Sequence, residues 1–148
     1  MERRDALKTM AAAMAAAVSA NALAADHDHH QHDHGAMGKR NVGVIAASSE
    51  CLTTGEACLA HCLYLLGTGD TEMAACATSV NEMMAVCQAL FKLSSQDSKQ
   101  LPALAKIAAD TCTSCEKECR KHEKKHQECK DCADSCAACL KECKKLAA

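Results

Sequence analysis

The sequence has very few aromatic residues: one Tyr, one Phe and no Trp among 148 residues. Aromatic rings normally supply much of the area that a core buries, so this chain must build its core from sulfur, Ala and Leu. The net charge is only -2, with Lys and Glu scattered along the chain. This balance argues against an electrostatic nucleic-acid binder. The length suits one small soluble domain.

The sequence also lacks an apolar run long enough to span a bilayer, which needs about 20 residues. Residues 1–24 hold a shorter Ala-rich run after Arg3 and Arg4, and end in the small-x-small sequence Ala22-Leu23-Ala24. This pattern predicts an export signal and a periplasmic location, with no membrane span after the signal is removed. The Arg pair resembles a twin-arginine signal, although the bulky apolar residue that usually follows such a pair is missing. The sequence therefore supports export more strongly than it supports the twin-arginine route.

Residues 25–40 form a His-rich segment, ADHDHHQHDHGAMGKR. It contains too little apolar surface to fold, so we expect a disordered tail. Imidazoles at this density can collect divalent metal ions, and a solubilising linker is the alternative.

Residues 41–148 read as helices, and no alternating strand pattern is convincing. We expect helices over about 41–66 and 71–93, a third that begins near Pro102, and a fourth that ends near the C-terminus. Asp70 is the expected cap of the second helix, and a turn is expected near 121–126. The predicted fold class is all-α: an antiparallel up-down four-helix bundle with a cysteine-lined core.

Cysteine is the residue that is present in excess, with 13 in the chain. At about 100 degrees per residue, the cysteines of each expected helix fall on one face. Because a bundle turns such faces inward, we expect the thiols to converge on one axis. The thirteen candidate metal-ligating cysteines are Cys51, Cys58, Cys62, Cys76, Cys87, Cys112, Cys115, Cys119, Cys129, Cys132, Cys136, Cys139 and Cys143.

Two further features lie on the same inner faces. Met73, Val80, Met83 and Met84 continue the apolar face of the second helix, and we interpret the methionines as core packing rather than as ligands. Gly55 lies between Cys51 and Cys58, where it weakens a helix by roughly 1 kcal/mol relative to Ala. It is expected to leave room for an ion array or for a close helix crossing.

Three interpretations of the thiols remain open. A disulfide-linked exported helical structural protein is favoured by an oxidising compartment, but the cysteine count is odd and neighbours four apart on one helix have poor geometry for bonding. A zinc-binding thiolate protein would need closed sets of four, each with two net negative charges, and would leave one cysteine over. Cu(I) accepts two thiolates, and residues four apart on a helix are close enough to share one ion.

Charge favours Cu(I) over zinc, because one Cu(I) per thiolate leaves the core electrically neutral. The expected load is therefore about one Cu(I) per cysteine. We do not expect an enzyme, because the sequence has no catalytic set, phosphate-binding Gly loop or inner carboxylate pair. A redox enzyme that uses a single Cys-x-x-Cys pair would not explain why every expected helix has cysteines along one face.

Three motifs carry a resemblance to a known family: CLTTGEACLAHC, TCTSCEKEC and CKDCADSCAACLKEC. Through them, the mature chain resembles the exported copper storage proteins of bacteria. The resemblance implies a four-helix bundle, assembly as a homotetramer, and a core in which thiolates bind many Cu(I) ions. It also implies a role in holding copper for copper-dependent enzymes such as the membrane methane monooxygenase.

The family places His and Met residues at one open end of the bundle, where copper is thought to enter. His61 and Met73 match that pattern, so they join the cysteines as candidate metal ligands. His122 and His126 lie near the turn expected between the third and fourth helices. We interpret them as solvated turn residues, with a role at the opposite end, beside Cys119 and Cys129, as the alternative.

Overall fold

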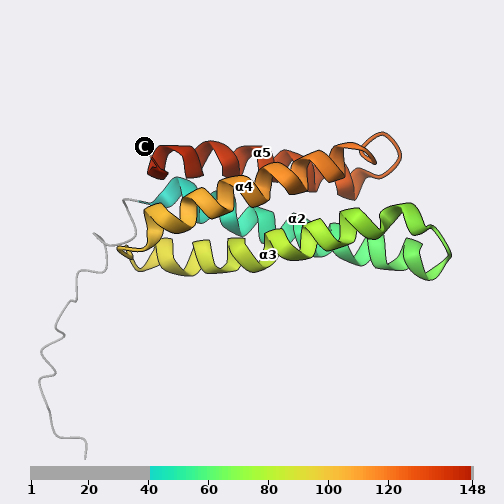
Figure 1. Ribbon diagram of the computed structural model, residues 1–148, viewed down its shortest axis with the longest axis horizontal. Helices are drawn as coiled ribbons and strands as arrows, with labels where there is room; N and C mark the ends of the chain where they lie inside the picture. Colours follow the sequence, from blue (N-terminus) through green and yellow to red (C-terminus); the bar gives the residue numbers. More distant parts are fainter. Residues whose placement is uncertain (1–40, 148) are drawn as a thin grey trace, which may run out of the picture. The chain divides into compact units, whose positions relative to one another are not determined.

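The computed structural model describes residues 41–147, without the side chain of residue 147. The predicted signal (1–24) and the predicted tail (25–40) lie outside the described residues. The described part contains four α-helices and one short 3-10 helix, and no strand (Figure 1). The elements are α2 (Val42–Gly67), η1 (Thr71–Met73), α3 (Ala74–Ser95), α4 (Leu101–Arg120) and α5 (Gln127–Ala147).

The turn between α2 and α3 follows from its local chemistry. Gly69 has a φ of 99 degrees, a backbone conformation that L side chains rarely adopt. The Asp70 carboxylate then accepts a hydrogen bond from the backbone N–H of Glu72, at 3.2 Å. This bond caps η1, which leads directly into α3. The expected capping role of Asp70 is thus confirmed.

The turn between α4 and α5 contains neither Gly nor Pro, and an ion-pair cluster closes it. Arg120, the last residue of α4, lies 2.8 Å from the carboxylate of Glu123 in the turn and 2.7 Å from that of Asp134 on α5. It also pairs with Glu116 one helical turn earlier, at 3.3 Å. The cluster therefore holds α5 back against α4 where the local sequence permits one long helix. At the other end of α4, Pro102 occupies the first turn, as expected.

The helices pack as an antiparallel bundle of the predicted class. The neighbouring pairs are α2 with α3, α3 with α4, α4 with α5, and α5 with α2. A hydrogen bond of 2.7 Å between the hydroxyls of Thr54 and Ser135 joins α2 to α5. The Asn41 side-chain amide donates to the Ser94 carbonyl oxygen, at 3.1 Å, and so ties the start of α2 to the end of α3.

The core differs between the two ends of the bundle. At the end with the α3–α4 turn it is apolar and contains the buried side chains of Val44, Leu90 and Leu101. The buried hydroxyls of Ser48 and Ser94 donate there to carbonyl oxygens of their own helices, at 2.7 Å each. Cysteine occupies most of the remaining core positions, toward the end with the α2–α3 and α4–α5 turns. In residues 41–147, no helix is both long and apolar enough to cross a membrane.

Candidate metal centre

All thirteen cysteines lie in the core, and the side chain of each is 0% exposed. All thirteen are free thiols, so no pair among them forms a disulfide. The two to five cysteines on each expected helical face therefore do converge on one axis, as their spacing predicted. This arrangement contradicts the alternative of a disulfide-linked scaffold.

The thiols fall into groups whose sulfur atoms all lie within 4.8 Å of one another. Two groups contain four sulfurs, and two overlapping groups contain three. The groups are Cys51, Cys87, Cys112 and Cys139; Cys58, Cys62, Cys76 and Cys129; Cys58, Cys119 and Cys132; and Cys115, Cys132 and Cys136. Each group of four takes its members from at least three helices, so a metal ion there would join the helices of the bundle.

Direct sulfur contacts connect these groups. Cys115 Sγ lies 3.9 Å from the Sγ atoms of both Cys119 and Cys132, and Cys119 Sγ lies 3.6 Å from Cys76 Sγ. These distances are well beyond an S–S bond of about 2.05 Å. Because Cys58 and Cys132 each belong to two groups, ions bound in this core would share ligands.

Burial and mutual hydrogen bonding change the acidity of the thiols. The hydrogen bond with Cys139, and then burial, raises the pKa of the Cys143 thiol above its ordinary value. The hydrogen bond with Cys112 acts in the same direction on the pKa of Cys87, and burial adds to it. Such thiols are protonated near neutral pH, so a metal ion that binds them as thiolates must displace their protons.

His61 and His126 meet at the end of the bundle where α2 ends and α5 begins. The ring nitrogens His61 Nε2 and His126 Nδ1 are 2.9 Å apart, and the ring centroids are 4.8 Å apart. The Glu128 carboxylate lies 3.7 Å from His61 Nδ1. Both rings are partly exposed, and Cys62 and Cys129 follow them by one and three residues.

This contact corrects the interpretation of His126. The alternative that His126 serves the end opposite His61 is wrong. His126 does lie in the expected turn and is partly exposed, but its ring contacts His61 as well as solvent. The physical reason is that α2 and α5 are antiparallel neighbours, which brings the end of one beside the start of the other. The signal that could have found the pair is antiparallel packing combined with one His near the end of α2 and another just before the start of α5. Met73, the other residue expected at this end, is 1% exposed and packs in the core.

The array of thiols is interrupted on α3. Between Cys76 and Cys87 the buried core positions of this helix are Ala77, Val80 and Met83, none of which carries a thiol. On α5 the thiols continue without such a gap, from Cys129 to Cys143. In the middle of the core, the cysteine thiols therefore come mainly from α4 and α5.

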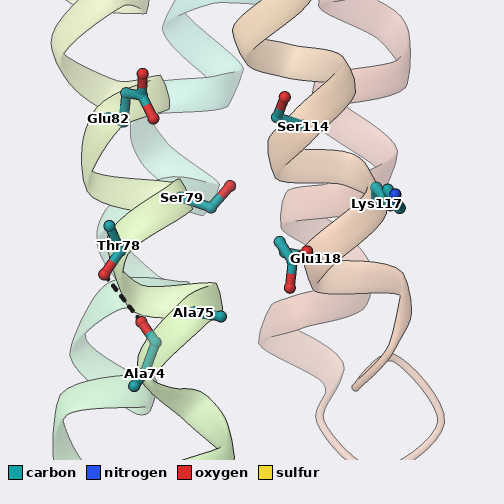
Figure 2. A pocket seen from close by; sticks show the side chains of 8 residues that line it. All are labelled: Ala74, Ala75, Thr78, Ser79, Glu82, Ser114, Lys117 and Glu118. Carbon is teal, nitrogen blue, oxygen red and sulfur yellow. Dashed lines mark hydrogen bonds between the residues drawn. The ribbon is translucent and has the colours of Figure 1, made fainter.

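The bundle surface also carries a groove of about 570 Å³ between α3 and α4 (Figure 2). The hydroxyls of Ser79 and Ser114 lie on its two sides, and Glu82, Lys117 and Glu118 line it. None of its lining residues is a cysteine or a histidine, so this groove is separate from the thiol core.

Comparison with known proteins identifies relatives of this arrangement. A family model described as copper storage protein matches residues 37–148. The solved structure of apo copper storage protein 3 from Bacillus subtilis is 28% identical, with a TM-score of 0.64, over 73% of this chain and 99% of that one. The Cu(I)-bound form of the Bacillus protein is 27% identical, with a TM-score of 0.67, over 73% and 98% of the two chains. Among curated protein sequences, none matches.

A third similar structure bears on location. It is described as a cytosolic copper storage protein from Streptomyces lividans with five coppers, and is 24% identical with a TM-score of 0.67, over 76% of this chain and 96% of that one. This comparison contradicts the expected periplasmic location, and that prediction is wrong.

Proposed function

The chain belongs to the copper storage protein family, and from this premise we propose that its thirteen buried cysteines together form the ligand set of a Cu(I) store. Storage of several Cu(I) ions in the thiol core of a four-helix bundle is the function of the chain. One observation carries the assignment of the ligands: thirteen free thiols, each 0% exposed, lie in overlapping groups in one core.

The chemistry of the core favours Cu(I) over zinc. Thiolates are soft ligands that select Cu(I), and each sulfur can bridge two ions. One Cu(I) per thiolate leaves the buried array neutral, whereas a zinc ion held by four thiolates buries two net negative charges. The overlapping groups of three also favour shared ligands over separate tetrahedral sites.

An anaerobic titration of the fully reduced protein with Cu(I), read against a competing chromophoric chelator, tests the proposal. We expect saturation near one Cu(I) per cysteine, with release of the protons that the thiols hold before they bind the metal as thiolates. The same protein with its thiols alkylated is the control, and should bind almost no copper. Saturation at one or two ions would contradict a store.

We further propose that His61 and Met73 are ligands that Cu(I) meets at the open end of the bundle. His61 supports this role because its side chain is 23% exposed and its neighbour Cys62 belongs to a group of four thiols. His126 shares the position through its 2.9 Å contact with His61.

A homotetramer is the proposed assembly, as the family resemblance implies. Leu63 and Tyr64 support it, because these large apolar side chains on α2 are 56% and 69% exposed in a single chain. Sedimentation of the reduced protein is expected to give four times the mass of the chain. We expect Leu63→Glu to lower that mass while the copper capacity per chain stays the same, and an unchanged mass would exclude this face from the interface.

The proposed recipients of the stored copper are copper-dependent proteins as a class. Delivery to a membrane methane monooxygenase was expected only through the exported members of the family. It loses that basis with the correction of the location, so the proposed role does not include it.

A further inference from the structure

Two adjacent methionines of α3 meet α2 at Gly55, beside the interruption of the thiol array. A methyl group placed on Gly55 would lie 2.7 Å from Met84 Cγ, 3.1 Å from Met84 Sδ and 3.1 Å from Met83 Cε. Both thioether side chains therefore occupy the space that a Cβ on α2 would take. The room that Gly55 leaves is filled by these two side chains, both of which carry sulfur.

The two methionines differ in their access to solvent. Met83 is 0% exposed and lies among the buried residues of the core, whereas Met84 is half-buried. Met84 also lines a surface groove of about 370 Å³ between α2 and α3, together with Leu52, Glu56, Asn81, Ala85 and Gln88. Glu56 is the only charged residue in that lining, and its carboxylate favours a cation there.

Gly55 separates two thiols that belong to different groups. Cys51, four residues before it, is a member of one group of four, and Cys58, three residues after it, is a member of the other. The contact at Gly55 therefore connects the surface groove, which Met84 lines, to the buried Met83 in the core. It lies at the level between the two groups of four thiols.

We propose that Met84 and Met83 form a lateral thioether route by which Cu(I) passes from the α2–α3 groove into the middle of the thiol array. The route rests on the proposed Cu(I) store and adds a second entrance to the open end at His61. Thioethers are soft ligands suited to Cu(I), and they carry no charge, so they hold the ion less firmly than thiolates do. Because Gly55 has no side chain, the two thioether side chains have room beside it.

The transfer is an exchange of ligands without oxidation or reduction. Cu(I) arrives on the Met84 sulfur, moves to the Met83 sulfur and then to cysteine sulfur of the core. Each cysteine thiol that takes up the ion releases its proton to solvent, and copper remains Cu(I) throughout. The methionines are regenerated unchanged and serve successive ions.

Loading kinetics of the full, reduced chain test the route. The Cu(I)–bicinchoninate complex is mixed anaerobically with excess protein in a stopped-flow instrument, and the loss of its absorbance gives the transfer rate. We expect Met84→Leu and Met83→Leu each to slow loading through the α2–α3 groove on the order of tenfold, which corresponds to about 1.4 kcal/mol in the barrier of that step. The number of Cu(I) ions bound at saturation should not change.

Leu52→Ile is the matched control, because it alters packing in the same groove without removing sulfur, and it should load at the wild-type rate. Wild-type loading rates in both methionine variants would overturn the route. Should Met83→Leu lose helical circular dichroism, Met84→Leu decides alone, since its half-buried side chain tolerates an apolar residue of similar size. Failure of the store itself would appear separately, as a low capacity of the wild-type protein.

A second readout distinguishes a ligand from a packing residue. In protein labelled with ¹³C at the methionine methyl groups, the Met84 and Met83 resonances are assigned by their loss in the Leu variants. We expect both to shift at the first equivalents of Cu(I), before the core is filled. Resonances that stay unshifted until saturation would contradict a role in entry.

Discussion

Loading the reduced protein with Cu(I) is expected to raise the midpoint of thermal unfolding by at least about 10 °C, which corresponds to about 2 kcal/mol for a domain of this size. The reason is that each group of four thiols draws its members from at least three helices, so bound ions cross-link the bundle. A ligand that prefers the folded state stabilises it by about 4 kcal/mol per site at a thousandfold excess over Kd.

The measurement is circular dichroism at increasing Cu(I) equivalents under anaerobic conditions. Thiols of the unfolded chain also bind copper, which reduces the effect, so the expected shift is well below the sum over all sites. A variant with Ser in place of Cys51, Cys87, Cys112 and Cys139 is the matched comparison, and should retain only part of the shift. A midpoint that does not move with copper would contradict binding within the core.

The copper-free bundle is expected to lose stability as the pH rises above about 8.5, the ordinary pKa of a cysteine thiol. Contacts with neighbouring thiols and burial raise the pKa values of Cys87 and Cys143 in the folded state. The stability that they contribute is therefore fully present below the unfolded pKa and is lost as the pH rises toward the folded one. In that window the unfolded chain releases protons that the folded chain keeps, and each such thiol costs about 1.4 kcal/mol per pH unit.

Urea unfolding measures this loss under reducing, anaerobic conditions. The free energy of unfolding is compared near neutral pH and near pH 9.5, about one unit above the ordinary thiol pKa. Cys143→Ala removes one such thiol next to Cys139 and should have a shallower slope, by about 1.4 kcal/mol per pH unit. Equal unfolding free energies at both pH values would show that the buried thiols titrate like exposed ones.

The helical elements and the inward cysteine faces were predictable because both are local properties of the chain. The Asp70 cap and Pro102 place the starts of α3 and α4 within a few residues of the structure, since each acts through its local backbone. A period of three and four residues between cysteines likewise selects one side of any helix that forms. The location was predicted wrongly from the N-terminal pattern, and the similarity to a copper storage protein described as cytosolic corrected it.

The tertiary structure alone decided which residues of different helices meet. The sequence by itself determined that this is an all-α chain with a thiol core and therefore a soft-metal chemistry. It did not determine that His126 contacts His61, that the cysteines divide into two groups of four and two of three, or that Met83 and Met84 fill the space at Gly55. These outcomes depend on the rotation and axial offset of one helix against its neighbour, which packing of the whole bundle sets and no local pattern encodes.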